Sequence, residues 1–203
     1  MNDRVLLGKS ECLHRHEIRY LDNVKRLNKV IDKIRKKHEL YWQMPYFDPK
    51  GGGENANILF LGVSPGTMSI LTGFVSVDNP DPTDVLLNVL MTASYIDFEK
   101  IALWNIIPYY LCDEEGKLCK PTMAEIKNGL EILIHDIFPL FPQLKAICLV
   151  GKHLRMVESC IDNIFKGKML IYRCPDPNPR SMTMKSYHFQ EAMDCLTAIS
   201  LLM

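Results

Sequence analysis

Four short apolar runs recur along the chain, at residues 57–61, 100–106, 144–150 and 168–173. Each run is shorter than a typical helix and is bounded by turn-forming residues, which favours a buried β-strand. Apolar residues at helical spacing fill the segments between and after the runs, at residues 83–95, 122–137, 152–165 and 186–201. The chain therefore alternates between predicted strands and predicted helices.

This alternation favours a mainly parallel sheet that is covered by helices on both faces. Thr122 and Glu125 have the spacing of a capping box, which marks the start of the helix after the second strand. No repeat and no long linker divides the chain. We therefore predict a single α/β domain over residues 1–203, a three-layer α/β/α arrangement with a four-stranded mainly parallel sheet.

The N-terminal part has a different pattern. Residues 11–40 are expected to form one long amphipathic helix, broken at most once. Its predicted apolar stripe consists of Ile18, Leu21, Leu27, Ile31 and Ile34. A loop that contains three consecutive glycines at 51–53 separates this helix from the first strand. We expect residues 1–50 to be a helical extension that packs on the domain.

The composition is that of a globular protein. Of the 203 residues, 47% are apolar and 24% are charged, which are ordinary proportions. No apolar run has the length of a membrane span, and the first ten residues lack a signal-peptide pattern. We expect a cytoplasmic monomer with no membrane association. Seven cysteines without a Cys-x-x-Cys pair indicate reduced thiols, so no metal and no cofactor is expected.

The net charge is zero, but the charges are unevenly distributed. Residues 1–50 carry 12 Lys and Arg against 7 Asp and Glu, whereas residues 51–144 carry 4 against 12. Residues 145–203 carry 8 against 5. A basic start and end beside an acidic middle is compatible with nucleic acid on one face. Ordinary solvated helix faces would give the same distribution.

Two proline-braced loops follow predicted strands and are the main candidates for chemistry. Gly62-Val63-Ser64-Pro65-Gly66 follows the first strand, and Asp176-Pro177-Asn178-Pro179-Arg180 follows the fourth. Each loop should leave the carboxyl end of the sheet, where open α/β folds bind their ligands. The sequence therefore predicts that the two loops meet across a cleft.

The first loop has the Gly-x-Ser-x-Gly spacing of a serine nucleophile elbow, but its chemistry argues against that role. The oxyanion hole of an elbow uses the backbone N–H of the residue after the serine. Here that residue is Pro65, which has no N–H. Residues 67–74 also lack a clear helical start, and no Gly-Lys-Ser/Thr follows, which excludes a phosphate-binding P-loop. The alternative to a binding loop is a purely structural turn.

Two further residues suit the recognition of a base. Asn105 ends the second predicted strand, where its amide offers both a donor and an acceptor to the edge of a pyrimidine. The alternative is that Asn105 caps a local backbone turn. Phe74 follows the first loop closely, and its ring can either stack on a flipped base or belong to the core.

In this order and on predicted strand ends, the motifs resemble the uracil-DNA glycosylase superfamily over about residues 57–202. The resemblance implies a metal-independent enzyme that flips a base out of DNA and hydrolyses its glycosidic bond. It implies catalytic roles for Ser64, Asp176 and Asn178. It implies base contacts for Gly62, Val63, Gly66, Phe74 and Asn105. It implies DNA contacts for Pro65, Pro177, Pro179, Arg180 and Ser181, with Arg180 as the wedge that fills the gap left by the base.

The chain departs from the family pattern at two positions. Asp176 stands where the family has a histidine that donates to the departing base, and Ser64 stands where many members orient water with Asp or Asn. An ionised Asp176 would oppose a departing anion, since two charges about 4 Å apart repel by roughly 1–4 kcal/mol. Burial in the cleft could raise the pKa of Asp176 enough for it to act as a general acid.

We therefore expect a DNA glycosylase-like hydrolase with an altered pocket, acting on a modified pyrimidine in repair or against foreign DNA. Gly66, which stands where uracil-selective members have a tyrosine, would admit a 5-substituent. One alternative is a catalytically impaired module that binds nucleic acid or a protein. Another is an unrelated nucleotide-binding α/β domain, which the lack of a glycine-rich phosphate motif disfavours.

Overall fold

The main sheet of the protein is parallel throughout. The structure, a computed structural model, describes residues 8–151 and 155–203. Four strands lie in the order β4-β2-β5-β6, and every neighbouring pair is parallel. They are β2 (Ile58–Gly62), β4 (Ile101–Asn105), β5 (Ala146–Val150) and β6 (Leu170–Cys174). The predicted four-stranded sheet is confirmed, with small shifts at the ends of the strands.

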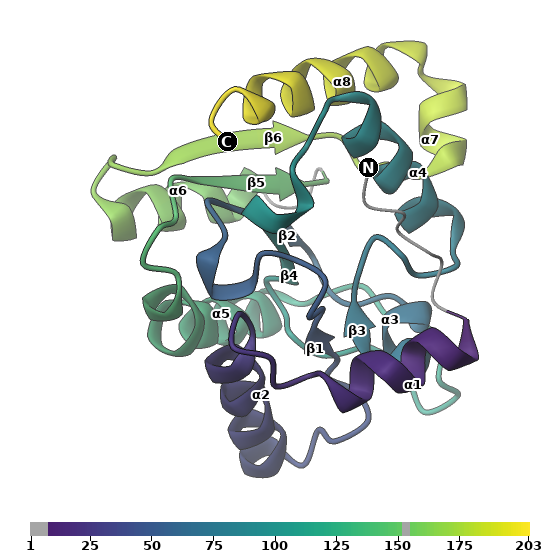
Figure 1. Ribbon diagram of the computed structural model, residues 1–203, viewed down its shortest axis with the longest axis vertical. Coiled ribbons are helices and arrows are strands. Elements are labelled where there is room, and N and C mark those ends of the chain that lie inside the picture. The colour runs from purple at the N-terminus through teal and green to yellow at the C-terminus, as the bar shows by residue number, and fades with distance from the viewer. Residues whose placement is uncertain (1–7, 152–154) are drawn as a thin grey trace.

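Helices cover both faces of this sheet (Figure 1). The described helices are α1 (Lys9–Glu17), α2 (Lys25–His38), α3 (Thr67–Thr72), α4 (Pro82–Ala93), α5 (Met123–Ile132), α6 (Arg155–Phe165), α7 (Pro179–Met184) and α8 (Ser186–Ser200). Successive strand residues point to opposite faces. The face with Ile58 and Phe60 packs against α4 and α8. The face with Leu59 and Leu61 packs against α2, α5 and α6. The three-layer α/β/α arrangement is confirmed.

The strand order fixes where a ligand can enter. The chain leaves the central strand β2 for β4 on one side and later returns to β5 on the other side. The connections therefore diverge between β2 and β5, and this reversal opens a crevice at the carboxyl ends of the strands. Gly62 lies directly beside Asn105 in the register of β2 and β4, so the first loop and the candidate asparagine start as neighbours.

The N-terminal extension is two helices rather than one. The prediction that residues 11–40 contain a helix with one break is correct in outline, because α1 and α2 are separated at residues 18–24. Leu27, Ile31 and Ile34 are buried as expected, but Leu21 is 45% exposed. Leu21 belongs to the connection between the helices, where the 3.6-residue period no longer decides which side chains are buried.

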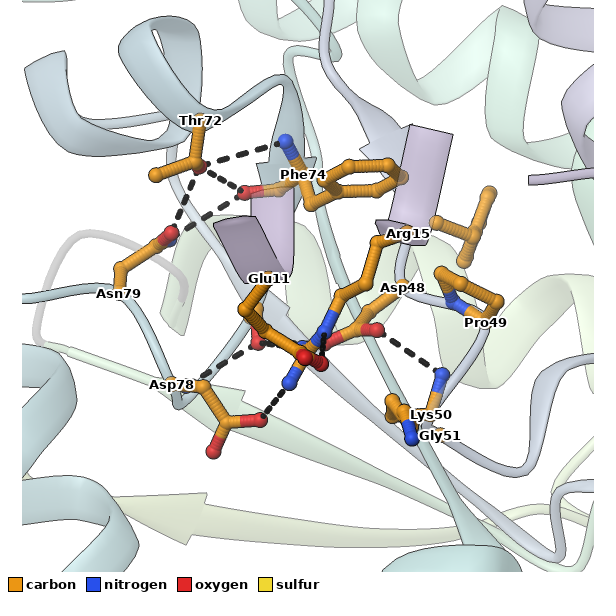
Figure 2. A network of polar contacts seen from close by, with 12 residues as sticks. Glu11, Arg15, Asp48, Pro49, Lys50, Gly51, Thr72, Phe74, Asp78 and Asn79 are labelled. Carbon is orange, nitrogen blue, oxygen red and sulfur yellow. Dashed lines mark hydrogen bonds and ion pairs between the residues drawn. The ribbon is translucent and has the colours of Figure 1, made fainter. Parts of the chain in front are cut away.

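A buried charge network fastens α1 to the domain (Figure 2). The guanidinium of Arg15 is almost fully buried and forms ion pairs with Asp48, Asp78 and Glu11. Ser76 donates a hydrogen bond to the same Asp48 carboxylate. Asp48 follows the two-residue strand β1 (Tyr46–Phe47), and Asp78 follows its parallel partner β3 (Phe74–Val75). Arg15 thus ties three segments together that are distant in the sequence.

Several short elements were not predicted. The strands β1 and β3 have two residues each, which is too short for a periodic pattern. Helix α3 covers residues where no clear helical start was expected, and α7 begins at Pro179. Asp81 caps α4, and the capping box of Thr122 and Glu125 is present. The expected start of α6 at 152–154 lies outside the described residues. Within the described ranges, no helix is long and apolar enough to cross a membrane.

Candidate functional site

A cavity of about 1230 Å³ opens at the carboxyl ends of the parallel strands. The loop after β2, the last residue of β4, the end of β5 and the segment after β6 all contribute to its wall. The start of α4 and the first half of α8 close it from one side, and residues 118–121 approach from another. The cavity therefore occupies the crevice that the strand order creates.

Most of the expected site residues gather here. The cavity is lined by Gly62, Val63, Ser64, Pro65, Gly66, Asn105, Asp176, Pro177 and Ser181. The two proline-braced loops thus meet across one cleft, as their positions after parallel strands required. Asp176 also lies beside the turn at Gly151, because a methyl carbon at that glycine would be 4.0 Å from its Cβ.

Asn105 and Gly62 fit against each other closely. A methyl carbon at Gly62 would lie 2.7 Å from Oδ1 of Asn105, a contact that real side chains do not make. The absence of a side chain at position 62 is therefore what allows the amide to lie over the end of β2. By contrast, a methyl carbon at Gly66 would meet nothing within 4 Å, so the space beside that glycine is open.

The amide of Asn105 is available to a ligand. The residue is only 6% exposed and lines the cavity. No group of residues 8–151 or 155–203 makes a hydrogen bond with its side chain. It does not cap a local turn, which was the alternative interpretation of this residue. Among the described residues, the buried side-chain polar atom without a partner is Nε1 of Trp104, not an atom of Asn105, so the amide of Asn105 reaches the cavity and can pair there with a donor and an acceptor of a ligand.

Phe74 is not placed to stack on a ligand. Its ring is fully buried and lies 4.6 Å from the ring of His16 and 6.3 Å from that of Tyr46, measured between centroids. Its neighbour Val75 lines the cavity instead. The physical reason is that adjacent residues of the short strand β3 point to opposite sides. The expectation of a stacking ring at Phe74 is therefore corrected.

Asn178 also has a structural task. Its Oδ1 accepts hydrogen bonds from the backbone N–H groups of Arg180 and Ser181, which makes it the N-cap of α7. The side chain does not line the cavity, and neither do Pro179 and Arg180. The expected base contact of Asn178 is thus replaced by helix capping, which satisfies N–H groups that have no partner within the helix. Arg180 is exposed at the first turn of α7.

Asp176 lines the cavity but is exposed rather than buried. We expected burial to raise the pKa of Asp176 enough for a general-acid role, but the side chain is not buried. A half-buried carboxyl is found elsewhere in the cavity wall, at Asp84 in the first turn of α4. Burial, together with the hydrogen bond and charge of Asp81, raises the pKa of Asp84 to about 8. Asp84 is therefore largely protonated at neutral pH.

Sequence reasoning missed Asp84 and His188. The signal for Asp84 was present, since Asp81 and Asp84 stand in the first turn of a capped helix, where two carboxyl groups come close together. His188 is buried at the start of α8 and lines the cavity, and its Nδ1 lies 3.2 Å from Oγ of Ser181. This contact joins α8 to α7.

The described charges of the cavity are mixed rather than basic. Its acidic lining residues are Asp81, Asp84, Asp176, Glu191 and Asp194, and its Lys and Arg residues are Lys120, Arg173 and Lys185. Arg173 is already paired with Glu158, with an N–O distance of 2.6 Å. Among the residues that the structure describes, no cluster of His, Cys, Asp and Glu could hold a metal ion.

The fold and the cavity define a three-layer α/β protein with a cavity at the carboxyl edge of a parallel sheet. The sequence profile of the Uracil DNA glycosylase superfamily matches residues 49–197, well over half of the chain. The chain belongs to this superfamily. The matched range contains both proline-braced loops and leaves α1 and α2 outside.

A solved structure agrees with the family at the level of the fold. The chain is similar to wild-type SMUG2 of Pedobacter heparinus, with a TM-score of 0.56 and 14% identity over 88% of this chain and 86% of that chain. A protein of Methanosarcina acetivorans with a provisional uracil DNA glycosylase assignment has a TM-score of 0.46 and 16% identity, over 72% and 92% respectively. No curated protein matches the chain in sequence.

Proposed function

We propose that this protein is a DNA glycosylase-like hydrolase that accepts a flipped pyrimidine and cleaves its N-glycosidic bond. The observation that carries the proposal is Asn105, whose side chain lines the cavity, makes no hydrogen bond within residues 8–151 and 155–203, and lies where the missing side chain of Gly62 leaves room for it. An amide can pair with both a donor and an acceptor on a base edge. Membership of the superfamily supports DNA as the polymer from which the base is taken.

The reaction needs an attacking water and a stabilised leaving group. In our proposal, Ser64 and backbone groups of the 62–66 loop orient the water that attacks the sugar carbon. The bond between that carbon and the base nitrogen then breaks, its electron pair leaves with the base, and the water that has bonded to the carbon releases a proton to the solvent. Asn105 holds the base by its edge. No metal takes part in this scheme.

Asp84 is the best candidate to donate a proton to the leaving base. A general acid must be protonated at the working pH, and the raised pKa of Asp84 meets that requirement. Asp176 is exposed at the other side of the cavity, where its charge disfavours a base that departs as an anion. Asp84 and Asp176 together therefore favour bases that leave in a protonated, neutral form, such as a base derived from cytosine.

The space beside Gly66 bears on substrate choice. Because nothing lies within 4 Å of a methyl carbon at this position, the cavity has room for a substituent on the pyrimidine ring. We propose that the substrate is a modified pyrimidine rather than uracil alone.

Replacing Gly66 with Tyr should exclude larger bases and spare any activity on uracil. If Gly66→Tyr lost activity equally on all bases, Gly66 would not line the base pocket.

The decisive experiment is a panel of oligonucleotides, single- and double-stranded, that carry different modified pyrimidines. Excision leaves an abasic site that alkali cleaves, so the products are scored by size. Asn105→Ala is the negative control, because it removes the amide. If no base is released by the wild type and Asp176→His also releases none, the proposal fails and the alternative holds, namely a catalytically impaired module that binds nucleic acid or a protein.

A further inference from the structure

Three of the seven cysteines meet behind the wall of the cavity. Cys148 lies on β5, Cys174 is the last residue of β6, and Cys195 lies on α8. Cys148 and Cys174 are buried, whereas Cys195 is half-buried and packs against the same apolar cluster. Cys174 also lines the cavity. Nothing in the proposed hydrolysis uses these thiols.

The topology explains why the three sulfurs come together. Cys174 pairs with Val150 in the register of β5 and β6, so Cys148 and Cys174 point to the same face of the sheet. That face is covered by α8, which brings Cys195 over the two strands. Cys148, Cys174 and Cys195 therefore belong to one packed cluster beneath α8.

The surroundings make the three thiols unequal. The interactions of Cys195 with Cys148 and then with Cys174 lower the pKa of the Cys195 thiol. Burial, followed by its contacts with Cys174 and Cys195, raises the pKa of Cys148. A thiolate is the reactive form of cysteine, and the half-buried Cys195 is the member that a small oxidant can reach. The cluster therefore contains one reactive sulfur beside two potential resolving sulfurs.

We propose that Cys195 and Cys174 form a reversible disulfide when the protein meets a hydroperoxide. The Cys195 thiolate attacks the peroxide oxygen, the O–O bond breaks, and a sulfenic acid and an alcohol or water result. The Cys174 sulfur then attacks the sulfenic sulfur, the S–S bond forms, and hydroxide leaves with the thiol proton as water. Two electrons pass from the two sulfurs to the peroxide, which balances the step.

Cys174 is a better resolving partner than Cys148 because of its place in the sheet. Cys148 lies in the middle of β5, which is paired with β2 on one side and β6 on the other. Cys174 ends the edge strand β6 and is followed by Pro175 and Asp176. The end of an edge strand can shift toward α8 with less loss of backbone pairing. A disulfide there would also fix the Asp176 loop and change the cavity wall.

The test is peptide mapping of the full chain after treatment with hydrogen peroxide and blocking of the remaining thiols. Trypsin separates the three cysteines into peptides 146–152, 174–180 and 186–203. We expect a linked pair of peptides 174–180 and 186–203 that dithiothreitol separates. The exposed thiols Cys119 and Cys160 provide the control variants, and Cys160→Ser should leave the link unchanged.

Variants then identify the attacking sulfur. Cys195→Ser should abolish oxidation at Cys174, whereas Cys174→Ser should leave a sulfenic acid at Cys195 that dimedone traps. Mapping of the wild type needs no variant to fold, so it decides the proposal by itself. A link through peptide 146–152, overoxidation of Cys195 without a link, or oxidation confined to Cys119 and Cys160 would each overturn it. These outcomes do not depend on whether the protein excises a base.

Discussion

At the scale of single residues, the close fit between Gly62 and Asn105 allows the most direct test of the role of Asn105. Gly62→Ala would place a methyl carbon 2.7 Å from Oδ1 of Asn105, so the amide must move. Loss of its contact to the base should cost about 1–3 kcal/mol, a decrease of roughly 5- to 150-fold in kcat/KM. The matched control is Gly66→Ala, since a methyl carbon there meets nothing within 4 Å. Equal effects of the two substitutions would contradict this account.

The carboxyl of Asp84 makes a prediction about pH. Its pKa is raised from an ordinary 3.8 to about 8 by burial and by Asp81, so the folded state holds a proton that the unfolded state releases. The resulting stability is fully present below about pH 4 and is lost as pH rises through about 8. In Asp84→Asn, the melting temperature should depend less on pH between pH 5 and 9 than in the wild type. As the control, Asp194→Asn changes an exposed carboxyl and should keep the wild-type dependence of melting temperature on pH.

The same carboxyl should govern the rate if it is the general acid. Activity should then fall as pH rises through about 8, where Asp84 ionises. Asp84→Asn should lower kcat by about 10²–10⁴-fold, whereas Asp176→Asn should have a smaller effect because Asp176 is exposed. A large loss in Asp176→Asn with an unchanged rate in Asp84→Asn would reverse the assignment of the two carboxyl groups.

At the scale of elements, Arg15 joins α1 to the segments after β1 and β3. Arg15→Met would remove the guanidinium partner of the buried Asp48 and Asp78 carboxylates. Breaking a buried ion pair from one side typically costs about 3–5 kcal/mol, which urea unfolding would measure. Lys25→Met is the control, because Lys25 and Asp22 form a surface pair, worth at most about 1 kcal/mol. A loss below about 1 kcal/mol in Arg15→Met would mean that α1 is not fastened by this network.

The strands of the main sheet were predictable because each is a continuous apolar run between turn residues. The two proline-braced loops were placed correctly because both follow parallel strands. The role of Phe74 was mispredicted because it depends on which way the side chains of a two-residue strand point. The role of Asn178 was mispredicted because it depends on a helix cap. Such local geometry leaves no periodic signal in the sequence.

At the scale of the whole molecule, the distribution of charge decides how the proposed DNA substrate would be held. The described lining of the cavity is not basic, so phosphate contacts must come from the surface around it, where Arg180 is exposed. Binding should weaken steeply with salt, and Arg180→Ala should reduce the slope of log K against log salt by about 0.9. The control is Lys36→Ala, since α2 and α7 lie at opposite ends of the molecule (Figure 1). An unchanged slope in Arg180→Ala would place the DNA elsewhere.

The amide of Asn105 also separates what the fold needs from what a ligand needs. Within the part of the chain that the structure describes, its side chain makes no hydrogen bond, so an apolar side chain of similar size could replace it without breaking one. Asn105→Leu should therefore leave the melting temperature unchanged or raise it, with a gain of up to about 1 kcal/mol, and should abolish ligand binding. Unchanged stability together with lost binding would show that this side chain serves the cavity rather than the fold.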